Sequence, residues 1–132
     1  MVQGLMPSTQ HQFMPMRFVN CKLMVTLKEH PFAYVQDYPA HHWDAPQYAN
    51  YPPNARALDT FLGDPDFLGQ GHAQGYLKQR AFELHREYGT VLVDPDPKNT
   101  RAISCYEKAG FCARDITACE DGDPVLVMTF QP

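Results

Sequence analysis

The sequence predicts a single α/β domain in which a mixed, mostly antiparallel sheet is flanked by helices. Its 132 residues are enough for one domain, and a content of 44% hydrophobic and 20% charged residues is typical of a chain that buries a core. The first half carries strand patterns, whereas two helical segments alternate with short apolar strands in the second half. No internal repeat or composition shift indicates a second domain, so residues 1–132 are expected to form one unit.

The N-terminal part is expected to form an arm followed by a hairpin. Residues 1–16 are polar and rich in methionine, and we expect a flexible arm there, with a short helix or strand that packs on a partner chain as the alternative. Residues 18–27 have strand character, and residues 32–38 alternate as the second strand of an antiparallel hairpin. The connection over 39–54 is long and aromatic, and loops of this kind are usually functional or disordered.

Acidic and aromatic residues in and beside this connection could bind a cation. Aromatic faces attract ammonium groups, and carboxylates pair with them. The candidate substrate-binding residues are therefore Asp37, Trp43 and Asp44, for a polyamine or a sugar amine. The adjacent His41 and His42 could suggest a metal, but consecutive loop residues rarely converge on one ion, and we predict no metal site.

The sequence over 57–75 predicts a strand, then a loop, then a helix with a glycine-rich start. Apolar residues favour a strand over 57–63, which a Gly-Asp-Pro-Asp sequence ends. Three glycines then frame the start of a helix over 71–88, where free N–H groups and the positive end of the helix dipole suit a phosphate. The alternative is a strand-to-helix turn in which glycine only relieves steric crowding.

The helix over 71–88 has an apolar face at three- and four-residue spacing, and Gly89 ends it. Residues 90–94 form a short apolar strand, which this crossover makes parallel to the strand over 57–63.

A second helix is predicted over 100–109. Asn99 or Thr100 caps its start, and Gly110 ends it. The chain then closes with two strands around an Asp-Gly turn, over 111–117 and 124–130.

Two motifs at this spacing resemble the acetyl-CoA site of the GCN5-related N-acetyltransferase superfamily. They are LGQGHA at 68–73, which lacks the Gly-Lys-Ser/Thr ending of a nucleotide P-loop, and NTRAISCYEKAGF at 99–111. The strand LDTFLG at 58–63 is similar to the one that carries the catalytic aspartate in aminoglycoside 6'-N-acetyltransferases. The resemblance covers about 31–130 and departs from the family at Leu68, often Arg or Gln, and at Ala73, usually Gly.

The resemblance implies an enzyme that transfers an acetyl group from acetyl-CoA to a primary amine, without a metal. It makes Asp59 the general base and Tyr106 the donor of a proton to the departing sulfur. The residues that it assigns to acetyl-CoA binding are Phe61, Leu62, Leu68, Gly69, Gln70, Gly71, His72, Ala73, Asn99, Ala102 and Tyr106. Three of the site residues also have a purely structural interpretation. The Asp59 carboxylate could be satisfied by backbone N–H groups, Tyr106 could only pack its helix on the sheet, and Asn99 could only cap the helix.

The N-terminal side departs from the family. The full acetyltransferase fold has one more strand and two helices before the position of Phe18, so the chain resembles an N-terminally truncated member. An acyltransferase for a lysine-derived siderophore precursor, or a non-catalytic CoA-binding or oligomerising subunit, therefore stays open. The apolar hairpin over 18–38 would be exposed, which predicts a homodimer that buries it.

Net charge and cysteine usage narrow the class of protein and the kinds of partner to expect. The net charge of −4 argues against nonspecific nucleic-acid binding and suits a cationic small-molecule acceptor, although it is also an ordinary solubility charge. None of the four cysteines forms a C-x-x-C pair, and neither a signal peptide nor a membrane-spanning apolar run is evident. We expect a cytoplasmic protein with reduced thiols and no membrane partner.

Overall fold

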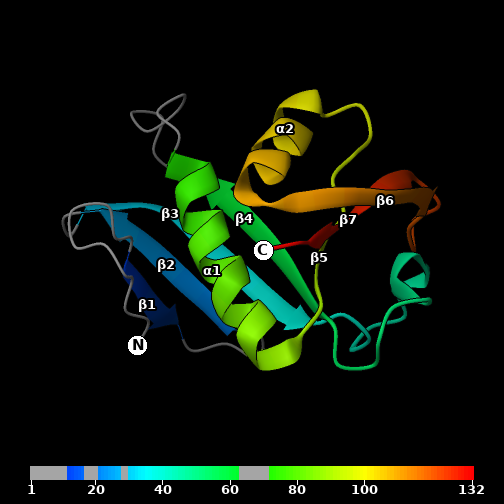
Figure 1. Cartoon of the computed structure of the whole chain (residues 1–132), viewed down its shortest axis with the longest axis horizontal. Helices are drawn as coiled ribbons and strands as arrows, with labels where there is room; N and C mark the ends of the chain where they lie inside the picture. Colours follow the sequence, from blue (N-terminus) through cyan, green and yellow to red (C-terminus); the bar gives the residue numbers. More distant parts are fainter. Residues whose placement is uncertain (1–11, 17–20, 28–29, 63–71) are drawn as a thin grey trace.

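The computed structural model describes residues 12–16, 21–27, 30–62 and 72–132, and Figure 1 shows a sheet with both long helices on one face. The described strands form a seven-stranded sheet in the order β1-β2-β3-β4-β5-β7-β6. The strands are β1 (Gln12–Met16), β2 (Cys21–Leu27), β3 (His30–Pro39), β4 (Arg56–Leu62), β5 (Val91–Val93), β6 (Phe111–Ala118) and β7 (Pro124–Phe130). The helices are α1 (His72–Tyr88) and α2 (Thr100–Ala109), with a short 3-10 turn, η1 (Pro46–Tyr48). The mixed, mostly antiparallel sheet flanked by helices is confirmed.

Strand β1 corrects the expectation of a flexible arm for residues 12–16, whereas residues 1–11 of that arm lie outside the described residues. Its residues pair antiparallel with β2, from Gln12 opposite Thr26 to Met16 opposite Lys22. The strand carries Pro15, which cannot donate to a ladder but is tolerated on an edge strand such as this one. A strand therefore does precede the hairpin, and it covers the edge of β2 that a partner chain was expected to cover. The homodimer therefore stays a prediction, but an exposed edge of β2 no longer supports it.

The sheet divides between β4 and β5. These two strands are parallel, as predicted, but they pair only through Arg56 with Val91 and Ala57 with Leu92. From Leu58 to Leu62, β4 continues beside β3 without a pairing to β5. Beyond Ala57, none of the described strands pairs with the side of β4 that faces β5.

Alternation along the strands separates two apolar clusters on opposite faces of the sheet. The helix-side cluster joins α1 and α2 to the strands through Val35, Leu58, Tyr76, Leu77, Ala81, Leu84, Val91, Val93, Ala109, Phe111, Met128 and Phe130. The other cluster comprises Ala40, Tyr48, Ala55, Ala57, Leu92 and Val127. Three of its members come from the connection over 40–55, so this connection packs against the sheet rather than acting as a spacer.

A buried ion cluster attaches α1 to the sheet. Asp37 on β3 is fully buried and accepts from Arg56 Nε at 2.7 Å and from Arg80 Nη2 at 2.8 Å. Arg80 Nη1 also lies 3.3 Å from Glu83, and the Arg56 guanidinium lies 4.7 Å from the centre of the Tyr88 ring. The structure does not support the prediction that Asp37 binds substrate, because the residue is buried and both of its oxygens are held by arginines on the helix side. Asp37 shares this face with Val35, two residues earlier in the strand.

Near its N-terminal end, α1 is also tied to β4. The Tyr76 and Thr60 hydroxyls are hydrogen-bonded to each other across the helix-side core. Thr60 follows Asp59 directly, so this contact fixes the helix against the strand that carries the predicted base.

Both ends of α2 are formed as predicted. The Asn99 side chain accepts a hydrogen bond from the Ala102 N–H at 3.1 Å, and Gly110 has a left-handed φ of 109°. A side chain at Gly110 would be strained by that φ, and a Cβ there would lie 3.0 Å from the Phe130 ring.

We expect Asn99→Ala to lower the free energy of unfolding by about 1 kcal/mol, because an N–H of the first turn loses its side-chain acceptor. Urea unfolding followed by circular dichroism measures this loss. Asn99→Asp is the matched control, since its carboxylate also accepts at the cap. Equal loss in both variants would show that the side chain has a different role.

Two further observations concern the described residues. Cys105, Cys112 and Cys119 carry free thiols. None of the helices within the described ranges is long and apolar enough to cross a membrane.

Candidate active site

Asp59 lies in the middle of β4, on the face away from the helices. Its side chain accepts a hydrogen bond from the Tyr38 hydroxyl of the neighbouring strand. Burial raises the pKa of Asp59 to about 6, and the nearby Asp94 carboxylate adds to the rise, whereas the Tyr38 hydrogen bond opposes it. A carboxylate with this pKa is mostly ionised at neutral pH yet basic enough to accept a proton, which suits a general base.

Tyr106 reaches the same region from α2. Its ring packs edge-on against Phe111, with 5.6 Å between the ring centres. Burial raises the pKa of Tyr106 far above its usual value, and the Asp59 carboxylate raises it further. The phenol therefore stays protonated at neutral pH and lies within electrostatic reach of Asp59, and the catalytic roles of the two side chains stay predictions.

The described residues among those predicted to bind acetyl-CoA belong to the end of β4, the start of α1 and α2 with its cap. Phe61 and Leu62 end β4 beyond its pairing with β5, and His72 and Ala73 begin α1. Asn99 and Ala102 share the hydrogen bond of the α2 cap, so the structural alternative for Asn99 is confirmed while its contact with the cofactor stays a prediction. The four predicted residues between β4 and α1 lie outside the described residues: Leu68, Gly69, Gln70 and Gly71.

A cleft of about 410 Å³ is lined mainly by the connection after β3. Its lining residues are Tyr38, Ala40, Trp43, Asp44, Ala45, Gln47, Tyr48, Asp94 and Glu120. They include three carboxylates and three aromatic rings, and none of them is a lysine, arginine or histidine. The predicted residues Trp43 and Asp44 both lie here, whereas Asp37 does not.

Hydrogen bonds and ring contacts hold the walls of the cleft. Asp94 accepts from Gln47 Nε2 at 3.1 Å and from the Tyr48 hydroxyl, and burial raises its pKa despite these bonds. The Trp43 ring stands edge-on to Tyr38, with 5.3 Å between ring centres, and is about half exposed. Tyr38 thus touches both the cleft and Asp59, which joins the two parts of the site.

Seven cleft residues were not among the predicted site residues, and five of them have polar side chains: Tyr38, Gln47, Tyr48, Asp94 and Glu120. Asp94 did carry a signal, because it directly follows a short apolar strand that runs parallel to β4. Polar residues at the carboxyl ends of parallel strands often line binding crevices. Glu120 carries no comparable local signal, since the β6–β7 turn brings it to the cleft.

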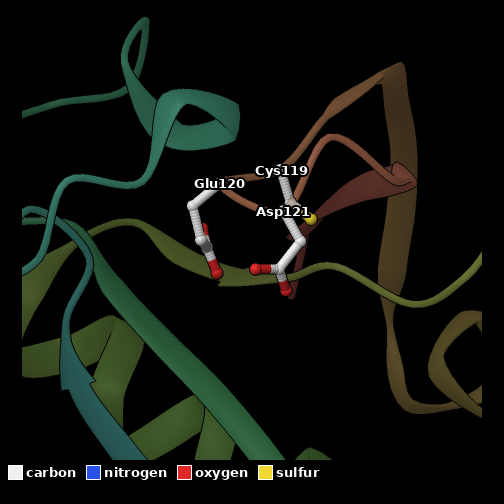
Figure 2. Close-up of side chains that lie close together, drawn as sticks. All are labelled: Cys119, Glu120 and Asp121. Carbon is white, nitrogen blue, oxygen red and sulfur yellow. The ribbon is translucent and has the colours of Figure 1, made fainter.

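Glu120 also belongs to a small cluster on this turn, drawn in Figure 2. One possible ligand atom each from Cys119, Glu120 and Asp121 lies within 4.8 Å of the others. The three residues are consecutive, and both carboxylates are exposed. Exposed acidic groups often lie this close without an ion, so we assign the cluster no metal role and treat Glu120 as part of the acidic wall of the cleft.

The sequence and the fold are similar to those of known acetyltransferases. Residues 18–117 match the family model of the acetyltransferase (GNAT) domain, and the chain belongs to this family. It is 33% identical over 78 residues to the aminoglycoside N(6')-acetyltransferase type 1 of Klebsiella pneumoniae, a match that covers 58% of this chain and 39% of that protein. A kanamycin resistance protein of Rhizobium radiobacter is 33% identical over 78 residues, which cover 58% of this chain and 72% of that protein.

Solved structures agree with this assignment. AAC(6')-Ib in complex with paromomycin and acetyl-CoA superposes with a TM-score of 0.76 at 29% identity. The match covers 85% of this chain and 64% of that chain. The resemblance to this family that the motifs predicted is confirmed, and the chain spans less than two thirds of the length of this structural relative.

Proposed function

We propose that this chain is an acetyl-CoA-dependent N-acetyltransferase that acts on a primary amine of a cationic small molecule, as in the aminoglycoside 6'-N-acetyltransferases. The main support is the place of Asp59. It lies beside the opening between β4 and β5 and is hydrogen-bonded to Tyr38, a wall of the acidic cleft. A base between a cofactor opening and an acceptor cleft is the arrangement that acetyl transfer requires.

In this proposal each residue has one task. Bound acetyl-CoA supplies an acetyl thioester, held by the start of α1 and by the backbone of β4 beyond Leu58. Asp59 takes a proton from the ammonium group of the acceptor, directly or through a water, so that the neutral amine can form the new N–C bond. As the C–S bond breaks, Tyr106 gives its proton to the leaving sulfur. Backbone N–H groups near Phe61 and Leu62 polarise the thioester carbonyl.

The cleft supports an acceptor with several positive charges. Asp44, Asp94 and Glu120 place carboxylates around it, and Trp43 offers an aromatic face to an ammonium group. Similar proteins are named for aminoglycosides and kanamycin, which carry several amines. An aminoglycoside is therefore the acceptor class that we propose.

Acetyl-CoA is expected to bind with or without an acceptor, because the opening beside β4 does not depend on the cleft. Isothermal titration calorimetry measures this binding. Release of free thiol from acetyl-CoA in the presence of kanamycin measures transfer, with glucose, which lacks an amine, as the matched control acceptor. Absence of heat and of a thermal shift at millimolar acetyl-CoA would overturn the proposed function.

A further inference from the structure

One wall of the cleft comes from an exposed part of the connection after β3. Trp43 and Asp44 line the cleft, yet the Trp43 side chain is 51% exposed and Asp44 is exposed as well. Ala40 and Gln47, on either side of this part, are buried. Burial alone therefore does not fix Trp43 and Asp44, and their placement depends on the polar contacts of the backbone around them.

A histidine side chain closes this part of the connection into a loop. His41 Nε2 lies 3.0 Å from the carbonyl oxygen of Tyr51 and 3.0 Å from that of Pro52. A carbonyl oxygen only accepts hydrogen bonds, so Nε2 carries a proton and donates to both. The loop over 42–50 lies between the two ends of this contact. It contains five of the nine residues that line the cleft: Trp43, Asp44, Ala45, Gln47 and Tyr48.

Tyr51 extends this contact to β6. Its hydroxyl donates to Asp115 Oδ1 at 3.1 Å. Burial and this hydrogen bond raise the pKa of Tyr51 to about 12, so the phenol stays a donor at neutral pH. Strand β6 leads into the turn that carries Glu120, and Figure 1 shows η1 near this turn. The hydrogen bonds from His41 through Tyr51 to Asp115 thus join the loop wall of the cleft to the wall that Glu120 forms.

We propose that His41 is a positioning residue of the acceptor cleft, because its hydrogen bonds to the far end of the loop fix Trp43 and Asp44 in the cleft wall. This inference rests on the proposed function. His41 is not among the residues that line the cleft, and Asp59 lies on β4 outside the loop, so His41 acts on the reaction through the loop. If the loop were free, a bound acceptor would have to order it, and this loss of conformational freedom would lower its affinity.

The first test measures the affinity for the acceptor. His41→Ala removes the donor, and one hydrogen bond changes an equilibrium by about 3- to 10-fold, so the dissociation constant for kanamycin should rise by about that factor. The turnover number and the affinity for acetyl-CoA should stay nearly unchanged, because Asp59 is not part of the loop. His41→Gln is the matched control, since its amide nitrogen can donate from about the place of Nε2 and should retain most of the affinity.

Tyr51→Phe tests the link between the two walls. It keeps the carbonyl oxygen that accepts from His41 and removes only the hydroxyl that reaches Asp115. Because the two contacts lie in series, the double variant of His41→Ala and Tyr51→Phe should lose less kanamycin affinity than the product of the two single losses. Losses that multiply would overturn this link.

The second test needs no acceptor. Trp43 is the only tryptophan of the chain, so its fluorescence anisotropy reports the mobility of the loop in the free protein. The anisotropy should fall in His41→Ala and return in His41→Gln. The melting temperature should change little in either variant, because the contact lies at the surface.

Three results would overturn the role of His41. Unchanged anisotropy in His41→Ala would mean that other contacts hold the loop, and a mobile Trp43 with unchanged kanamycin affinity would mean that the loop does not bind the acceptor. Equal losses of affinity in His41→Ala and His41→Gln would mean that the imidazole ring itself contacts the acceptor. If the wild-type protein does not bind kanamycin, the proposed function fails, and the anisotropy still decides whether His41 fixes Trp43.

Discussion

Asp59→Asn lowers the turnover number by a factor on the order of 10² or more and leaves the affinity for acetyl-CoA nearly unchanged, as expected for the loss of a general base. The amide keeps the shape of the side chain and can still accept from Tyr38, but it cannot take a proton from the substrate ammonium. Steady-state kinetics with kanamycin and calorimetry with acetyl-CoA separate the two effects. Wild-type turnover in this variant at neutral pH would reduce Asp59 to a structural role.

The pH profile gives an independent signature of the same residue. Because the pKa of Asp59 is about 6, kcat/KM of the wild-type protein should fall as the pH drops below that value and the carboxylate becomes protonated. The profile of Asp59→Asn should lack this limb. Raising the pH should partly rescue the variant, because more of the acceptor amine is then already neutral.

The raised pKa also predicts how Asp59 affects stability. Its ordinary value is 3.8, so between about pH 4 and pH 6 the folded chain holds a proton on this group that the unfolded chain has lost. The contribution of Asp59 to stability therefore falls as the pH rises through this window. Asp59→Asn removes this cost, and its melting temperature at pH 7 should equal or exceed that of the wild-type protein, which makes it a folded control for the kinetic test.

Local chemistry explains why much of the fold could be predicted. The second helix was placed over 100–109 because Asn99 and Gly110 carry signals for the start and end of a helix that depend on few distant contacts. The β1 strand was missed because its short sequence contains proline and three of its five residues are apolar at irregular spacing, so the pairing with β2 decides its conformation.

The acceptor side of the site shows where prediction from sequence ends. Asp37 and Asp59 are both acids in apolar strands, yet Asp37 faces the helices and Asp59 faces the cleft side. A shift of one residue in register exchanges the two faces of a strand, and the composition of the strand does not reveal which face is buried under a helix. The cleft also joins Gln47, Asp94 and Glu120 from three separate segments, which only the sheet order brings together.

Asp37→Ala is expected to lower the free energy of unfolding by about 3 to 5 kcal/mol, because it removes the buried carboxylate that pairs with both Arg56 and Arg80 between β3, β4 and α1. Urea unfolding at neutral pH measures the loss. The matched control is Glu83→Ala, which removes the more exposed ion pair of Arg80, and there the change should be about 0 to 1 kcal/mol.

The same variant decides between the two roles considered for Asp37. If the carboxylate holds α1 on the sheet, Asp37→Ala protein that remains folded at low temperature should bind kanamycin with the affinity of the wild-type protein, since the cleft lies on the other face. A stably folded variant with weakened kanamycin binding would instead restore Asp37 to the acceptor site. The first outcome is favoured because the Asp37 carboxylate is buried and paired with two arginines. Asp37 would then affect the active site only indirectly, through the placement of α1 against β3 and β4.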